Sequence, residues 1–156
     1  MTPASKASLD GFYAAKRLAI IGVSRKGGDY SRMLFSALRK KGYDVVPVNP
    51  AVGEVDGVAC KASIKEVAPA VEGVIVLLPA GKIDGAVREC AESGVKRVWV
   101  HSALKKNLAA LEAPGICAGK GIDYISGTCP FMFLPGTPFP HSLHGGLVKA
   151  FGGAPK

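Results

Sequence analysis

A turn near the start of the chain carries the residue types that bind phosphate. Gly22 allows a backbone to approach a ligand closely, and Ser24 offers a hydroxyl donor. Ser31 has the character of a helix N-cap, and a helix start supplies unpaired amide donors and the positive end of a dipole. The remaining members of the predicted loop are one apolar and three basic residues: Val23, Arg25, Lys26 and Arg32. The turn predicts an anion site, with an ordinary tight turn as the alternative.

Missing motifs narrow the class of phosphate compound. The dinucleotide pattern GxGxxG is absent, because the sequence after Gly22 reads VSRKG. Asn49 stands where an acidic residue would bind the adenosine ribose of NAD. The neighbouring Arg and Lys residues favour a nucleotide with an extra phosphate on its ribose. An NADP-dependent oxidoreductase or another nucleotide-binding regulator is therefore one candidate function.

Two predicted strands and a helix position this turn. Residues 18–23 form an apolar run that only Gly22 interrupts, which is typical of a strand buried in a parallel sheet. Apolar residues at helical spacing follow Ser31 and stop at Gly42. A second buried strand is predicted over residues 43–48. The order strand, turn, helix, strand is that of a βαβ unit.

Strands and helices alternate along the rest of the chain. The further predicted elements are a helix over 9–16, a strand over 73–78, a helix over 81–93, a strand over 95–101, a helix over 102–112 and a strand over 122–125. Pro114 and Gly115 are expected to break the helical structure. The alternation predicts an α/β fold: a three-layer, Rossmann-like, doubly wound domain with a mainly parallel five-stranded sheet. Right-handed crossovers favour the strand order 3-2-1-4-5, with the ligand at the switch between strands 1 and 4.

Length, composition and charge indicate one soluble domain with an anionic partner. The chain has 156 residues, of which 48% are hydrophobic, and a formal net charge of +8. Its basic residues are scattered in pairs and triplets, which argues against specific nucleic-acid binding. No apolar run reaches the roughly 20 residues of a membrane span, and the first residues do not resemble a signal peptide. We expect a cytoplasmic protein without a membrane partner.

The cysteines and histidines do not form a metal-binding pattern. The cysteines lack CxxC spacing and stand among apolar or small residues: Cys60, Cys90, Cys117 and Cys129. We therefore expect reduced thiols, not a disulfide scaffold or a zinc site. His141 and His144 would share one face of a helix, and a metal site with Cys129 or His101 is a weak alternative.

The end of the chain is too apolar to be a free tail. We divide the chain into a ligand-binding domain over residues 1–130 and an extension over residues 131–156. The apolar members of the extension are Phe131, Met132, Phe133, Leu134, Phe139, Leu143, Leu147 and Phe151. We expect the extension to pack on the domain or to form a homodimer interface.

Several segments in a fixed order resemble a known family. They are IIGVS at the first turn, GYDVVPVNP, a strand ending in VLLP, GVKRVWVHSA and the closing IDYISGTCP. From about Leu9 to Cys129 the chain is similar to CoA-binding domain proteins, a Rossmann-like group. The group includes small free-standing bacterial members and the N-terminal domain of the succinyl-CoA synthetase alpha subunit. The resemblance implies a small protein that binds CoA or an acyl-CoA.

The resemblance also implies where the ligand would lie. The CoA diphosphate would lie near Gly22, Val23, Ser24 and Ser31. The adenine would lie against the ends of two strands, at Val48, Asn49, Pro50, Leu78 and Pro79. The pantetheine arm would pass His101 and Ser102. Basic side chains of the loop would then hold the phosphates: Arg25, Lys26 and Arg32.

Two departures from the family pattern concern the ligand directly. Many relatives have Arg where this chain has Asp29, and Gly where it has Ala103. Asp29 places a negative charge in the loop that is expected to bind phosphate. We expect no catalytic residues, since the phosphohistidine of the synthetases belongs to a second domain. A chemical role for His101 and a mixed disulfide between Cys129 and a CoA thiol are the alternatives.

Overall fold

A parallel five-stranded sheet forms the centre of the protein. The structure is a computed structural model that describes residues 4–67, 71–101, 108 and 110–135. The strands of the sheet are β1 (Arg17–Ile21), β2 (Asp44–Val48), β5 (Gly73–Val76), β6 (Arg97–Val100) and β7 (Asp123–Ile125). All four neighbouring pairs run parallel. The predicted α/β, Rossmann-like fold class is confirmed.

The strand order differs from the expected 3-2-1-4-5. The observed order is β2-β1-β5-β6-β7, which is 2-1-3-4-5 in the numbering of the predicted strands. The chain passes back over β1 after β2, so that β5 pairs with the free side of β1. The direction of winding therefore reverses between β1 and β5, not between β1 and β6. Ligands of doubly wound sheets bind at this reversal.

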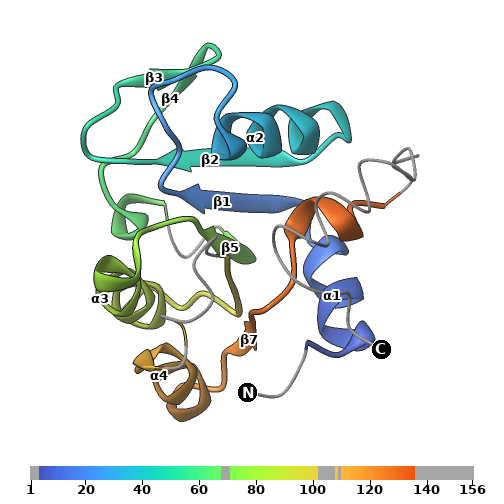
Figure 1. The fold of residues 1–156 in the computed structure, drawn as a ribbon, viewed down its shortest axis with the longest axis vertical. Helices are drawn as coiled ribbons and strands as arrows, with labels where there is room; N and C mark the ends of the chain where they lie inside the picture. Colours follow the sequence, from blue (N-terminus) through green and yellow to red (C-terminus); the bar gives the residue numbers. More distant parts are fainter. Residues whose placement is uncertain (1–3, 68–70, 102–107, 109, 136–156) are drawn as a thin grey trace.

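Helices cover both faces of the sheet (Figure 1). One face carries α1 (Lys6–Tyr13), α2 (Tyr30–Lys40) and the short 3₁₀ helix η3 (Pro130–Phe133). The opposite face carries η1 (Ile64–Glu66), α3 (Ala80–Glu92) and α4 (Ala113–Gly119). Within β1, Leu18 and Ile20 belong to the first core and Ala19 to the second. This alternation explains the continuous apolar run in the sequence, because both faces of the strand are buried.

A small hairpin lies beyond the end of β2. It consists of β3 (Glu54–Val55) and β4 (Val58–Ala59), which pair antiparallel. Figure 1 shows it above the carboxyl end of β2, near the loop that enters α2. The hairpin therefore stands beside the predicted phosphate loop.

Two helix starts differ from the sequence prediction. The N-cap of α2 is Asp29, in extended conformation, and Ser31 is the second residue of the helix. Pro114 and Gly115 were expected to end a helix running to about Glu112, and no further helix was predicted there, but Pro114 occupies the first turn of α4. Proline is tolerated there because the amides of the first turn have no partner within the helix.

The start of the predicted extension packs into the domain. Phe131 and Leu134 are buried in the same core as Leu18 and Trp99. The other predicted apolar positions, from Phe139 to Phe151, lie outside the described residues, as do His141 and His144. Among the described residues, none of the helices combines the length and the apolar character required to cross a bilayer.

Candidate functional site

Gly22 joins the ends of three neighbouring strands. Its φ is +97°, a conformation that side-chain-bearing residues rarely adopt. A Cβ atom added at Gly22 would lie 2.3 Å from the carbonyl oxygen of Leu77, directly after β5. The Gly22 N–H donates to the carbonyl of Val48, at the end of β2, at 2.9 Å. Only glycine allows the chain to leave β1 this close to its neighbours.

Hydrogen bonds to serine hydroxyls fix the loop after Gly22. The backbone N–H of Ser24 donates to the hydroxyl of Ser31 at 2.9 Å. The hydroxyl of Ser24 donates to the Asp29 carboxylate at 2.6 Å and accepts the Lys26 N–H at 3.1 Å. Ser31 is therefore a residue of the predicted loop, although it holds the loop from inside the helix and does not cap the helix.

The loop forms one wall of an open cleft at the carboxyl ends of the strands. The cleft has a volume of about 390 Å³. Its lining residues come from the loop, the first turn of α2 and the ends of β5 and β6: Gly22, Ser24, Asp29, Tyr30, Ser31, Leu77 and His101. The cleft lies at the reversal of winding between β1 and β5, where the fold predicts a ligand.

Aromatic side chains form the floor of the cleft. Tyr30 and His101 are stacked with ring centroids 5.0 Å apart, and His101 is 8% exposed. His101 Nδ1 lies 3.3 Å from the carbonyl oxygen of Thr128. The Tyr30 hydroxyl lies 3.2 Å from Cys129 Sγ, and burial, followed by the neighbouring Cys129, raises the pKa of Tyr30 well above its usual value. Tyr30 is therefore a neutral phenol, and the floor carries no formal charge from it.

Three of the predicted contact residues support the loop and do not line the cleft. The side chains of Val23 and Val48 are buried in the core. Asn49 donates from Nδ2 to the carbonyl of Val23 at 2.9 Å and accepts the Ala51 N–H at 2.9 Å. The side chain of Asn49 therefore ties the end of β2 to the loop.

The predicted cations of the loop fall into two groups. Arg25 and Lys26 are exposed on the loop itself. Arg32 faces away from the solvent and forms an ion pair with Asp56 at 2.6 Å. None of these three residues is among those that line the cleft.

The other predicted positions surround the same edge of the sheet. Pro50 is exposed after β2, Leu78 is half-buried after β5, and Pro79 is exposed as the N-cap of α3. Ser102 and Ala103 lie outside the described residues.

The sequence did not single out two lining residues, Tyr30 and Leu77. Tyr30 is the first residue of α2, and its position follows once Asp29 is identified as the N-cap. Leu77 lies beside the cleft because its carbonyl faces Gly22. The signal for Leu77 was present in the strand end VLLP, of which only the last two residues were chosen.

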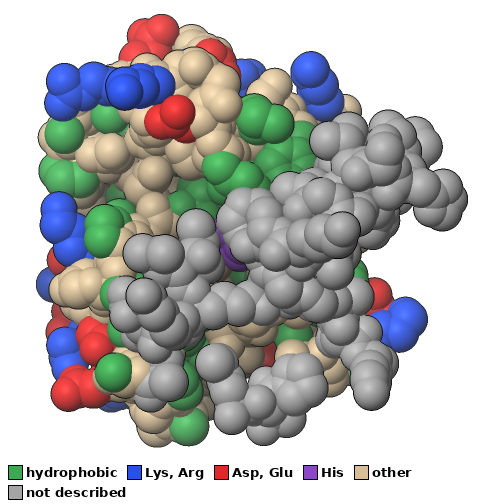
Figure 2. Space-filling view, viewed as in Figure 1, with side chains coloured by type: hydrophobic (Ala, Val, Ile, Leu, Met, Phe, Trp, Pro, Cys, Tyr) green, Lys and Arg blue, Asp and Glu red, His purple; other side chains and the backbone are tan. Residues whose placement is uncertain are grey.

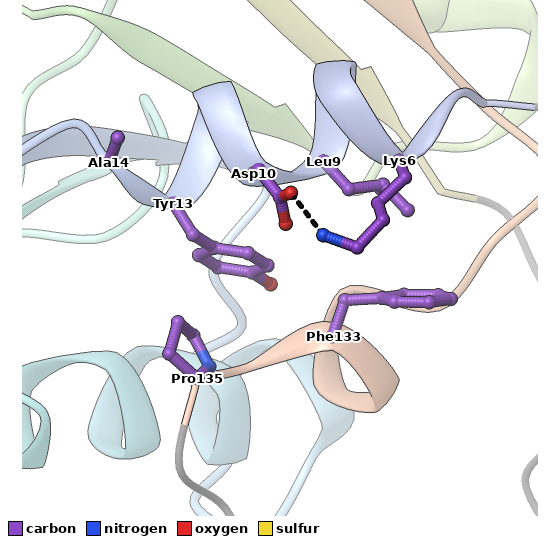
Figure 3. Close-up of a pocket in the computed structure, with 7 residues that line it drawn as sticks. All are labelled: Lys6, Leu9, Asp10, Tyr13, Ala14, Phe133 and Pro135. Carbon is purple, nitrogen blue, oxygen red and sulfur yellow. Dashed lines mark hydrogen bonds and ion pairs between the residues drawn. The ribbon is translucent and has the colours of Figure 1, made fainter.

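A larger cavity, of about 600 Å³, lies between α1 and η3. Figure 3 shows Leu9 and Tyr13 of α1 facing Phe133 and Pro135, with the ion pair between Lys6 and Asp10 beside them. None of the residues that line this apolar groove belongs to the loop after β1. Volume alone is therefore a poor guide to the ligand site, and the smaller cleft has the polar donors that a phosphate compound needs.

The four cysteines are free thiols in the structure. Cys129 is 1% exposed, and Cys90 and Cys117 are buried as expected. Burial raises the pKa of Cys90 to about 12 and that of Cys117 to about 11. No cluster of three or more potential metal ligands occurs among the described residues.

Comparison with known proteins identifies the family. Residues 16–135 match the family model described as a CoA binding domain. The protein YneT of Bacillus subtilis is 30% identical over 90 residues, which cover 58% of this chain and 67% of YneT. The alpha subunit of acetate–CoA ligase (ADP-forming) II of Pyrococcus furiosus is 33% identical over 96 residues, which cover 61% of this chain and 21% of the subunit.

Solved structures share the fold. A hypothetical protein from Pyrococcus horikoshii superimposes with a TM-score of 0.74 at 22% identity, over 85% of this chain and 94% of that protein. The chain spans about a fifth of the length of the ligase subunit but most of the small relatives. With the matched model spanning the sheet and the cleft, the chain belongs to the CoA binding domain family.

Proposed function

We propose that this protein binds coenzyme A or an acyl-CoA in the cleft between the loop after β1 and the ends of β5 and β6. The family match over residues 16–135 carries the proposal. The position of the cleft at the winding reversal agrees with it, because this is where doubly wound sheets bind nucleotides. The relationship to acetate–CoA ligase subunits agrees with a CoA compound as the ligand.

The loop would hold the CoA diphosphate. Gly22 lets the loop leave β1 close to Leu77, and Gly22, Ser24 and Ser31 all line the wall of the cleft. The start of α2 adds the positive end of a helix dipole. Arg25 and Lys26 would contact the phosphates, including the ribose phosphate that distinguishes CoA from NAD.

The ends of the strands would hold the rest of the ligand. The adenine would lie near Asn49 and Pro50 after β2 and near Leu78 and Pro79 after β5. The pantetheine arm would run over Leu77 and along the stacked rings of Tyr30 and His101. The stacked aromatic rings and Leu77 suit this arm, which carries amides and a thiol but no charge.

We further propose that binding is the function and that the chain alone catalyses no reaction on the acyl group. The relatives with a named activity are acetate–CoA ligases or their alpha subunits, of which this chain covers between 12% and 22%. A binding or regulatory role is the function expected of the part they share with this chain. The test is to incubate the protein with acetyl-CoA and follow the release of free thiol, which we expect to equal the rate without protein.

Isothermal titration calorimetry and thermal shift with CoA, acetyl-CoA, NAD and NADP test the ligand. A ligand that binds only the folded state raises the free energy of unfolding by RT ln(1 + [L]/Kd). CoA and acetyl-CoA are therefore expected to raise the melting temperature. Stabilisation by NAD or NADP but by neither CoA compound would overturn the proposal. Native mass spectrometry of freshly purified protein would identify any ligand that is retained.

A further inference from the structure

Arg32 connects the loop to the β3–β4 hairpin. Its Nη1 atom lies 3.1 Å from the carbonyl oxygen of Arg25 and 3.4 Å from that of Ser24. Its Nη2 atom lies 2.6 Å from Asp56 Oδ1, at the turn of the hairpin. The side chain of Arg32 is 16% exposed and that of Asp56 is 45% exposed, so the arginine end of this ion pair is the better shielded from water.

The contacts with Arg32 orient the peptide groups of the loop. A trans peptide is planar, and its carbonyl and N–H point in opposite directions. Because the Ser24 carbonyl is turned toward Arg32, the N–H of Arg25 is turned away from it. Arg32 thus fixes the direction of an amide donor in the loop that borders the cleft, without facing the cleft itself.

Asp56 is held firmly enough to anchor Arg32. It has a φ of +47°, and it is the one residue other than glycine with positive φ among the described residues. Its carbonyl accepts Nη1 of Arg39, from the last turn of α2, at 3.3 Å. Figure 2 shows Lys and Arg side chains beside acidic ones at this end of the molecule, over the hairpin and the start of α2. Two arginines of one helix therefore hold the hairpin turn.

We propose that Arg32 and Asp56 form a clamp that positions the phosphate loop, so that Arg32 is a positioning residue and not a ligand of the phosphates. The proposal rests on the proposed function, since it assigns the clamp a role in binding a CoA diphosphate. The guanidinium of Arg32 forms an ion pair with Asp56, whereas Arg25 and Lys26 lie on the exposed surface of the loop. The hairpin, which contributes no residue to the cleft lining, thereby controls the affinity of the cleft.

The change in CoA affinity when Asp56 is replaced tells whether Asp56 positions the loop or acts only through its charge, because the two roles predict changes in opposite directions. Asp56→Asn removes a negative charge close to an anion site, and electrostatics alone predicts tighter CoA binding. The clamp predicts the opposite, about tenfold weaker binding, because a charge-assisted hydrogen bond contributes roughly this factor. Asp44→Asn is the matched control, since Asp44 pairs with Arg17 at 2.9 Å at the start of β2.

The experiment measures CoA affinity by calorimetry and amide hydrogen exchange in residues 22–29. Asp56→Asn and Arg32→Gln are each expected to bind CoA more weakly and to exchange loop amides faster than wild type. Asp44→Asn is expected to change neither. The double variant Arg32→Gln/Asp56→Asn is expected to bind CoA no more weakly than Arg32→Gln. Unchanged or tighter binding by Asp56→Asn overturns the clamp. If the wild type does not bind CoA, the proposed function fails. Amide exchange in the loop then tests the clamp by itself: unchanged exchange in Asp56→Asn overturns the clamp, and faster exchange supports it.

Discussion

The hydroxyl of Ser31 accepts the backbone N–H of Ser24 at 2.9 Å, so a residue inside α2 holds the loop that precedes the helix. Ser31 is 6% exposed, and its hydroxyl lies at the wall of the cleft. Loop and helix therefore behave as one unit, and the first prediction concerns the bond between them.

Ser31→Ala leaves the Ser24 N–H without this acceptor. We expect a loss of about 1 kcal/mol in the free energy of unfolding, the usual contribution of one such hydrogen bond. CoA affinity is expected to fall as well, because the loop loses its fixed position. Urea unfolding and calorimetry measure the two effects. Ser36→Ala, on the same helix, is the control and should change neither; equal affinity of Ser31→Ala and wild type would contradict the role of Ser31.

Gly22→Ala is expected to be far more harmful than Gly28→Ala, although both glycines have positive φ, +97° and +91°. The new Cβ at Gly22 would clash with the Leu77 carbonyl at 2.3 Å, whereas nothing lies within 4 Å of the Cβ position at Gly28. We expect a loss of about 3 kcal/mol at Gly22, from backbone strain and the clash together, and about 1 kcal/mol at Gly28 from strain alone. Urea midpoints of the two variants measure the difference. Similar midpoints would show that the contact with Leu77 is easily relieved.

Asp29→Asn is expected to tighten CoA binding. The Asp29 carboxylate lines the cleft and repels a diphosphate, while Asn retains an oxygen that can accept the Ser24 hydroxyl. We expect affinity to rise about fivefold at low salt and the gain to shrink at high salt, because exposed charges are screened. Calorimetry at two ionic strengths tests this, with Asp10→Asn on α1 as the control. A loss of affinity would mean that Asp29 is needed for the shape of the loop more than it repels the ligand.

Stability is expected to fall above about pH 9. The pKa of Cys90 rises from 9.0 to about 12 on folding, chiefly because burial disfavours the thiolate. Between these values the unfolded chain has lost the proton and the folded chain has kept it, so the contribution is complete below pH 9 and is lost as pH rises. Each such thiol lowers the free energy of unfolding by up to about 1.4 kcal/mol per pH unit in this window.

Urea midpoints from pH 7 to pH 11 measure this decline. Cys90→Ala should be less stable than wild type at pH 7 because it leaves a cavity, but its decline above pH 9 should be shallower. Cys60→Ala is the comparison: Cys60 is only half-buried, and although burial also raises its pKa, its removal should change the decline less than that of Cys90. Parallel declines for wild type and Cys90→Ala would exclude Cys90 as a source of the pH dependence.

Removal of residues 136–156 tests the predicted extension. A chain ending at Pro135 retains Phe131 and Leu134, which belong to the core, whereas a cut after Cys129 would remove them. If the extension covers the apolar groove lined by Leu9 and Phe133, its removal should increase the binding of a hydrophobic dye. Light scattering then separates the two expectations. A halved mass assigns the extension to a homodimer interface. An unchanged mass with increased dye binding assigns it to packing on its own domain. No change in either measurement contradicts both expectations.

The strands and the fold class were predictable because burial on both faces of β1 leaves a continuous apolar run in the sequence. The strand order was not predictable. In the described part of the connection from β2 to β5, which omits residues 68–70, the elements are a short hairpin and the 3₁₀ helix η1, and their sequence does not indicate on which side of β1 the chain returns. The preference for right-handed crossovers was the ground for expecting β5 outside β2. The position of the winding reversal was misplaced for the same reason.

The candidate site was predictable where local chemistry decides it. Gly22, Ser24 and Ser31 were chosen by residue type and position, His101 followed from the family resemblance, and all four line the cleft. The ion pair of Arg32 was not predictable, because its partner Asp56 is 24 residues away in the sequence and no spacing rule links the two. A basic residue beside a phosphate loop suggests a ligand contact until the structure shows which carboxylate it faces.

The order of the strands also bears on how the protein avoids association through its sheet. β2 and β7 are the outermost strands, and such strands can pair with another chain and start aggregation. In β2, the carbonyl of Pro47 accepts the Lys61 N–H on the outer side, and the proline ring removes the N–H that another strand would need. β7, with only 3 residues, is too short to serve as a template. The protein can therefore be concentrated without its sheet growing from one molecule to the next.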